Sequence, residues 1–383
     1  MIVKESRIIP FRTQLVITRH NDFPSLHRSY LLFENSVKSP HTLKLYKWHL
    51  KKFLDFTKIR DYDALVGLDS ETIQALLENY AIYLKRRNLS GKTVEDYFSG
   101  IELFFECNKK FYYKKALHKM FPERHKTGNH TPYTTEDVRC LLASTSSKRI
   151  KALIHFFAST GARPSTLLDP VLRFKHVHSM PFNCKAVLLY SNTKDEFWAF
   201  LTPEATKSLE EYRDERIREG EIVTQESPVF ITKYESYGKR KERSPITYHG
   251  ILQIMTRLLD NSEVERIKEG YRYDKAVIYG FRKRFNTIMK LNGSVNSNIA
   301  EKLMAHKKGL DGVYFKPTRE ECFKEFVKAI LDLTVDENER LKQILEKQNE
   351  ELKNQPDKDR RITELEKKLE DVYRILSHYD KKI

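Results

Sequence analysis

Three side chains suited to phosphate chemistry lie within one short stretch of the second half of the chain. The stretch from Tyr279 to Tyr314 also contains Arg282 and His306. Arginine keeps its charge at any working pH, histidine gains and loses a proton near neutrality, and tyrosine carries an oxygen that can act as a nucleophile. A guanidinium also matches the oxygens of a phosphate group. The stretch therefore suggests chemistry on a phosphate.

The charge of the chain indicates a polyanionic partner. Its 383 residues include 69 Lys and Arg against 53 Asp and Glu, a formal net charge of +16. The basic residues recur along the chain rather than in one block, which favours nucleic acid over a membrane surface. A basic protein that is merely soluble is the alternative that charge alone leaves open.

Several function classes have no support in the sequence. No Walker loop and no glycine fingerprint occurs, so neither nucleotide hydrolysis nor a dinucleotide cofactor is expected. No apolar run approaches membrane-spanning length, and we expect a cytoplasmic protein with no membrane partner. The cysteines stand far apart, without zinc-type spacing, and are expected to be reduced and buried. They are Cys107, Cys140, Cys184 and Cys322.

The first third of the chain predicts a helical domain. Residues 1–25 read as an N-terminal arm, and residues 26–113 hold three amphipathic helices, the second expected to be capped by Ser70. The stripe Val94, Tyr97, Ile101, Phe104 and Phe105 is expected in the core. Residues 114–132 are basic and interrupted by proline and glycine, and they predict a linker. A positive linker suits a clamp closing round a duplex, although an ordinary loop explains it equally well.

The next two hundred residues predict a second, mixed domain over 133–332. A buried helix ends near Gly161 and is followed by Arg163. Two β-prone runs joined by a polar turn predict a hairpin with Lys194 at its tip. Helices are expected at 203–219 and 247–260, with a short strand near residues 228–232 and an exposed basic loop after it.

The order of these motifs resembles the tyrosine recombinase (phage integrase) family in an archaeal form. The segments are TGARPSTLL, Thr193-Lys194 in a hairpin, YGFRKRF, LMAH and a following tyrosine, and the resemblance covers about residues 35–330. It implies a mostly helical α+β protein: a helical core-binding domain that clamps DNA, and a catalytic domain with a small antiparallel sheet.

The resemblance also implies a role for each site residue. Arg163 and Arg282 would clamp the phosphate, Tyr314 would attack the phosphorus, His306 would activate the phenol, and Lys194 would protonate the leaving oxygen. The product would be a covalent 3′-phosphotyrosyl link that a second DNA end reverses. No metal, cofactor or small-molecule substrate is expected, because the arginines supply the positive charge.

Three positions depart from the family pattern. Tyr279 stands where histidine or lysine is usual, and we expect it to support the site by a hydrogen bond. Thr166 stands where a glutamate commonly follows the first arginine, so another group, such as Asp169, would orient Arg163. Tyr314 lies eight residues after His306, whereas the usual spacing of nine falls on Phe315. A shifted loop makes Tyr314 the nucleophile; the structural alternative is a buried packing tyrosine.

The extension 333–383 predicts helices that join protomers. Apolar residues from Ile362 to Tyr379 alternate at three and four residues, which predicts a short coiled coil or, equally, a helix docked on its own catalytic domain. The segment FKEFVKAI could instead be the helix that recombinase protomers exchange. We expect a homotetramer on two paired double-stranded DNA sites, associated with the nucleoid.

The expected function is site-specific recombination, whether integration, excision or dimer resolution. Two alternatives remain: a type IB topoisomerase, against which the tail and the small N-terminal domain argue, and a DNA-binding architectural protein whose catalytic site has decayed.

Overall fold

The computed structural model describes residues 28–123, 128, 130–232, 244–270, 272–306, 314–353 and 362–370. By its internal contacts the chain divides into two compact units, Met1–Lys126 and Thr127–Ile383. The predicted arm, most of the basic loop at 233–245 and the last heptad positions lie outside the described residues.

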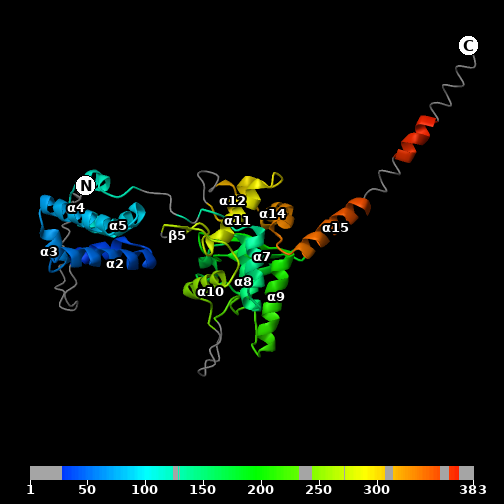
Figure 1. The fold of residues 1–383 in the computed structure, drawn as a ribbon, viewed down its shortest axis with the longest axis horizontal. Helices are drawn as coiled ribbons and strands as arrows, with labels where there is room; N and C mark the ends of the chain where they lie inside the picture. The colour runs from blue at the N-terminus through cyan, green and yellow to red at the C-terminus, as the bar shows by residue number, and fades with distance from the viewer. Residues whose placement is uncertain are drawn as a thin grey trace, which may run out of the picture. The chain divides into compact units, whose positions relative to one another are not determined.

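The first unit is a helical bundle, coloured blue to cyan in Figure 1. The predicted helices form, with two corrections. The cap of the second predicted helix is Asp69, whose carboxylate accepts from the backbone N–H of Thr72 at 2.9 Å, rather than Ser70. The predicted linker begins too early, because Leu117 lies in a short helix and is buried in the bundle core. The helices are α1 (Arg28–Ser36), α2 (Pro40–Thr57), α3 (Tyr62–Gly67), α4 (Ser70–Arg86), α5 (Gly91–Cys107) and α6 (Lys114–Lys119).

The core of the bundle confirms the predicted apolar stripe of α5. Val94, Ile101 and Phe104 are fully buried and lie in one cluster with Leu50 of α2. Gly100 lets α2 and α5 approach closely, since a Cβ there would lie 2.9 Å from the backbone of Tyr46. Burial of this face stabilises the bundle, and its lysines are left toward solvent.

The second unit is an α+β domain, mostly helical, as expected. Its larger sheet has the order β1 (Val177–Ser179), β2 (Lys185–Leu189) and β3 (Phe197–Leu201), all antiparallel. Val187 of β2 lies opposite Val177 of β1 and Ala199 of β3. A second sheet is the antiparallel pair β4 (Lys268–Glu269) and β5 (Arg272–Tyr273). The predicted hairpin is β2 and β3. The expected strand near residues 228–232 is wrong, since only isolated bridges occur there, at Pro228 and Ile231. The elements are α7 (Thr135–Ala143), α8 (Lys148–Thr160), η1 (Pro164–Leu167), η2 (Phe174–His176), β1 (Val177–Ser179), β2 (Lys185–Leu189), β3 (Phe197–Leu201), α9 (Pro203–Arg218), α10 (Tyr248–Asp260), β4 (Lys268–Glu269), β5 (Arg272–Tyr273), α11 (Tyr279–Leu291), α12 (Ser297–Leu303), α14 (Arg319–Leu333) and α15 (Glu337–Lys353).

Helix α8 is the centre of this unit. It packs against α9 and α11, and Leu153 and Phe157 on it are fully buried. A second apolar cluster joins the hairpin to α11, α12 and α14, with Phe200 of β3 contacting Phe326 of α14 at 5.4 Å between ring centroids. The first apolar cluster is the one that contains Leu153 and Phe157. Together the two clusters fix the ends of α8, α11, α12 and the hairpin relative to one another, and this positions the candidate site.

The four cysteines are free, and the expectation that all of them are buried is half right. Cys184 and Cys322 are buried in the apolar cluster of the hairpin, α11, α12 and α14. Cys107 and Cys140 are only half-buried.

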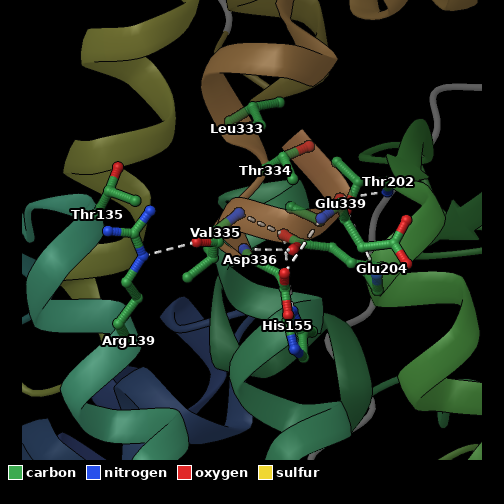
Figure 2. A network of polar contacts seen from close by, with 12 residues as sticks. Thr135, Arg139, His155, Thr202, Glu204, Leu333, Thr334, Val335, Asp336 and Glu339 are labelled. Carbon is green, nitrogen blue, oxygen red and sulfur yellow. Dashed lines mark hydrogen bonds and ion pairs between the residues drawn. The ribbon is translucent and has the colours of Figure 1, made fainter. Parts of the chain in front are cut away.

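The segment between α14 and α15 docks on the same unit (Figure 2). Glu204, buried in the first turn of α9, accepts from the backbone N–H groups of Val335 and Asp336 at 2.8 and 2.9 Å. Arg139 of α7 donates its Nε–H to the Val335 carbonyl at 2.8 Å. Val335 itself is buried in the core. We call Arg139, Glu204, Val335 and Asp336 the C-terminal anchor. The domain boundary predicted at residue 333 lies just before Val335 and Asp336.

Beyond the anchor, the extension exposes apolar side chains. In the short helix at 362–370, Leu365 and Leu369 are 58% and 57% exposed. The helix therefore does not bury these leucines on the second unit, which contradicts the docked-helix alternative over these residues. No helix in the described ranges is both long and apolar enough to cross a membrane.

Candidate active site

Arg163 is positioned by the end of α8. The helix ends at Gly161, which has a left-handed φ of 57° and lies so close to α11 that a Cβ would stand 2.8 Å from Phe285. The chain then turns into η1, where buried Thr166 donates its hydroxyl to the Arg163 carbonyl at 2.7 Å. Thr166 thus holds the backbone of Arg163 rather than its guanidinium.

Arg282 joins three segments from the first turn of α11. It is 7% exposed, and its guanidinium donates to the carbonyls of Gly161 at 2.8 Å and Met304 at 2.6 Å. The nitrogen that contacts Met304 also lies 2.7 Å from Nε2 of His306. Burial, and then the positive charge of Arg163, lower the pKa of Arg282 to about 10. Arg282 therefore stays charged at neutral pH, in a place where an anion would stabilise it.

His306 follows α12 and is held at both ring nitrogens. Ala305 has a left-handed φ of 51°, which turns the chain at the end of the helix. Nδ1 of His306 lies 2.5 Å from Oε2 of Glu301, and Nε2 faces Arg282. Because Arg282 only donates, Nε2 accepts, and the proton of the neutral ring is on Nδ1.

A cavity of about 670 Å³ opens beside these groups. The hairpin reaches it through Tyr190 and its turn, and Tyr190 shares a hydrogen bond of 2.6 Å with the hydroxyl of Ser165. Two carboxylates stand at its wall with the cationic groups. Its lining residues are Arg163, Asp169, Tyr190, Thr193, Asp195, Ala305 and His306.

Four predicted site residues lie outside this lining: Arg282, whose contacts are described above, and Lys194, Tyr279 and Tyr314. Lys194 is exposed on the hairpin turn, between two residues that line the cavity. Tyr279 begins α11 and is 47% exposed, near enough to Arg282 to influence its pKa. Tyr314 is 79% exposed, so the alternative of a buried packing tyrosine is wrong. Residues 307–313, which join Tyr314 to His306, lie outside the described ranges.

Phe315 takes the packing role at the position of the usual nucleophile. It lies partly buried against the cluster formed by the hairpin, α11, α12 and α14. The ammonium group of Lys302 stands 6.0 Å from the centre of its ring. Of the two neighbours, Phe315 is therefore committed to packing, and Tyr314 keeps its hydroxyl toward solvent.

Sequence reasoning missed Glu301 and Tyr190. Glu301 lies five residues before His306. An acidic residue about one helical turn before a candidate histidine is the sequence signal that could have indicated it. Tyr190 carried no local signal, since its hydroxyl meets the site only because the hairpin folds back on η1.

Comparison with known proteins identifies the fold. No protein-family model and no curated protein sequence matches the chain. Among solved structures, a Tn1549 transposon integrase in complex with transposon right end DNA is 14% identical, with a TM-score of 0.50, covering 78% of this chain and 97% of that one. A lambda integrase tetramer bound to a Holliday junction is 13% identical, with a TM-score of 0.49 and 78% of each chain covered. XerH site-specific recombinase bound to palindromic difH substrate is 18% identical, with a TM-score of 0.47, covering 70% of this chain and 73% of that one.

At these identities the likeness concerns the fold, and the Tn1549 integrase match spans nearly all of that chain. The chain has the fold of the tyrosine recombinases, as it is seen in the Tn1549 transposon integrase.

Proposed function

We propose that this chain is a site-specific DNA recombinase that cleaves and rejoins strands through a covalent 3′-phosphotyrosyl intermediate. One observation carries the proposal: Arg282 lies close enough to Arg163 for their charges to interact, beside a cavity that also holds His306. Two permanent cations and a titratable imidazole around one space suit a phosphodiester, whose charge grows during attack.

The proposed attack begins at Tyr314. Its oxygen forms a bond to phosphorus while the bond from phosphorus to the 5′ oxygen breaks, and Arg163 and Arg282 stabilise the non-bridging oxygens. A phenol is weakly acidic, so it needs a nearby base to become a nucleophile at neutral pH. Nε2 of His306 carries the lone pair of the ring, which accepts from Arg282 in this structure. In the proposed step a bound phosphate draws the guanidinium of Arg282 away, and Nε2 then accepts the phenol proton. The 79% exposure of Tyr314 leaves its hydroxyl available to an incoming phosphate.

Lys194 completes the step as general acid. Its place on the hairpin turn, next to lining residues Thr193 and Asp195, allows it to give a proton to the departing 5′ oxygen. Tyr279 supports the phosphate by a hydrogen bond. Attack of a 5′ hydroxyl from a second DNA end on the phosphotyrosine reverses the step and joins new strands.

The proposed partner is double-stranded DNA, bound by a homotetramer on two paired sites. The net charge of +16 supports a polyanionic partner, and the exposed lysines of α2 offer phosphate contacts from the helical unit. Such a protein would work in the cytoplasm on the nucleoid, in integration, excision or dimer resolution.

A covalent trap built from many sequences at once tests the proposal. A pool of duplexes with a randomised core and a nick in one strand is incubated with the protein, denatured, and separated from free DNA. Cleavage just upstream of the nick releases a short fragment, so the adduct cannot religate. We expect adducts that carry one enriched sequence, with the phosphate on Tyr314 by mass spectrometry of the peptide.

Three other outcomes would favour a different function or a different nucleophile. Absence of adduct from the whole pool, together with tight DNA binding, would favour the architectural alternative. Relaxation of a supercoiled plasmid without sequence preference would favour the topoisomerase. An adduct that persists in Tyr314→Phe would mean that another residue is the nucleophile.

A further inference from the structure

We infer that Glu301 is a positioning residue for His306, which holds the imidazole with Nε2 toward the phosphate. The inference rests on the proposed function for its catalytic consequence, while its geometric part stands on the contacts alone. Glu301 is 9% exposed, and its Oε2 lies 2.5 Å from Nδ1 of His306. The cavity lining includes His306 rather than Glu301, so the carboxylate acts through the histidine.

Glu301 is itself held in place from two sides. It lies on α12, and its carbonyl accepts from the backbone N–H of His306 at 2.9 Å, so carboxylate and imidazole belong to one tight turn. Its second carboxylate oxygen forms an ion pair with Lys290 of α11. Because α11 also carries Arg282, the carboxylate is fixed relative to the same helix that holds the proposed phosphate clamp.

This arrangement selects one form of the histidine. A carboxylate only accepts, so Nδ1 must donate to Glu301, and the lone pair of the neutral ring is left on Nε2. Arg282 approaches Nε2 from the other side at 2.7 Å and reinforces the same tautomer. The opposite tautomer would place two acceptors against each other at Nδ1 and two donors against each other at Nε2.

The carboxylate also balances the charge around the ring. Its negative charge lies 2.5 Å from Nδ1 and offsets the positive charge of Arg282, which faces Nε2. Other charged groups face this place: Asp169 and Asp195 on the cavity wall and Lys290 behind Glu301. Glu301 is the carboxylate that contacts the ring of His306 directly.

The test compares Glu301→Gln with Lys290→Met. Glutamine keeps the shape of the side chain but removes the charge, and its amide can turn a donor toward Nδ1. Lys290→Met removes the ion pair behind the carboxylate and leaves the contact between Glu301 and His306. A structural role in joining α11 to α12 would affect both variants alike, whereas a positioning role affects Glu301→Gln.

Two readouts are needed. We expect the rate of adduct formation with the trapped duplex to fall about 10–100-fold in Glu301→Gln. Lys290→Met should lose much less, because the carboxylate of Glu301 keeps its contact with Nδ1 of His306. Equal rates in wild type and Glu301→Gln would overturn the inference while the proposed function stood.

The second readout does not depend on activity. Nitrogen-15 chemical shifts of the His306 ring, assigned by comparison with His306→Asn, report which nitrogen carries the proton. We expect the Nδ1–H form in wild type at high pH and a mixed population in Glu301→Gln. A wild-type Nε2–H form would overturn the inference. If wild type forms no adduct with any duplex, the proposed function fails and the tautomer still decides the role of Glu301.

Discussion

Arg163 and Arg282, on separate segments of the second unit, lie close enough for the charge of Arg163 to lower the pKa of Arg282. Burial is the larger cause and the neighbouring guanidinium the second, and together they bring the pKa of Arg282 to about 10. Both groups remain charged at neutral pH. The site therefore holds positive charge that an oxyanion would offset.

Phosphate-like anions should stabilise the protein. Orthophosphate or vanadate at ten times its dissociation constant adds about 1.4 kcal/mol to the free energy of unfolding, or a melting temperature higher by about 2–6 °C. Arg163→Gln should lose most of this shift, because Arg163 lines the cavity. Arg218→Gln, an exposed arginine on α9, serves as the matched control and should keep it. Equal shifts in all three proteins would mean that the anions bind elsewhere.

Tyr314 and Phe315 should respond in opposite ways to substitution. Tyr314→Phe should abolish adduct formation and leave the free energy of unfolding within about 0.5 kcal/mol of wild type, because the side chain is 79% exposed. Phe315→Ala should lower the free energy of unfolding by about 1–3 kcal/mol, because its ring packs on the apolar cluster. Urea unfolding and the covalent trap separate the two effects. Activity in the exchanged pair Tyr314→Phe with Phe315→Tyr would refute this assignment.

The C-terminal anchor should depend on the carboxylate of Glu204. Glu204→Ala leaves the buried backbone N–H of Val335 and the partly buried one of Asp336 without their acceptor, which should cost about 2–4 kcal/mol. Hydrogen exchange at these two amides should accelerate at the same time. Glu211→Ala, on the exposed face of α9, is the control and should change neither quantity. Unchanged exchange at Val335 would show that the anchor does not need the carboxylate.

His155 should make the unfolding free energy fall in mild acid. Burial lowers the pKa of His155 to about 4 from an ordinary value of 6.5, so the unfolded chain takes up this proton first as the pH falls. Stability from this group is complete above pH 6.5 and decreases toward pH 4, by about 3 kcal/mol in total. Asp336 opposes the shift and Lys151 adds to it.

The carboxylate of Glu204 lies 3.8 Å from Nδ1 of His155. Its own pKa shift makes stability change with pH in the opposite direction. Burial raises the pKa of Glu204, so its contribution to stability falls as the pH rises through its range. The contribution of His155 is therefore read as the difference between wild type and His155→Gln in urea unfolding from about pH 4 to 7. Parallel profiles for the two proteins would contradict a buried neutral histidine.

Local signals in the sequence located most of the elements. The helices predicted at 203–219 and 247–260 form within one residue of these bounds, and the hairpin around Lys194 forms between its two β-prone runs. Caps and apolar periodicity act over a few residues, so they can be read without the fold. Ser70 was assigned a role that Asp69 performs, because adjacent residues offer nearly the same capping chemistry.

Contacts between segments that lie far apart in the chain could not be predicted from the sequence. Nothing local indicates that Glu204 would receive the backbone of Val335, or that Arg282 would donate to the carbonyls of Gly161 and Met304. Backbone carbonyls are the same at every residue, so only their arrangement in space makes them partners. The sequence by itself determined the fold class that the motifs resemble. It also determined the order of the candidate residues, which are Arg163, Lys194, Arg282, His306 and Tyr314.

The tertiary structure decided how these residues are used. It separates Tyr314, which faces solvent, from Phe315, which packs, although the two are neighbours with similar rings. It also places Glu301 behind His306 and brings the charge of Arg163 next to Arg282. Side-chain type and spacing determine which chemistry a residue can perform, but burial and the charges around it depend on packing between segments far apart in the chain.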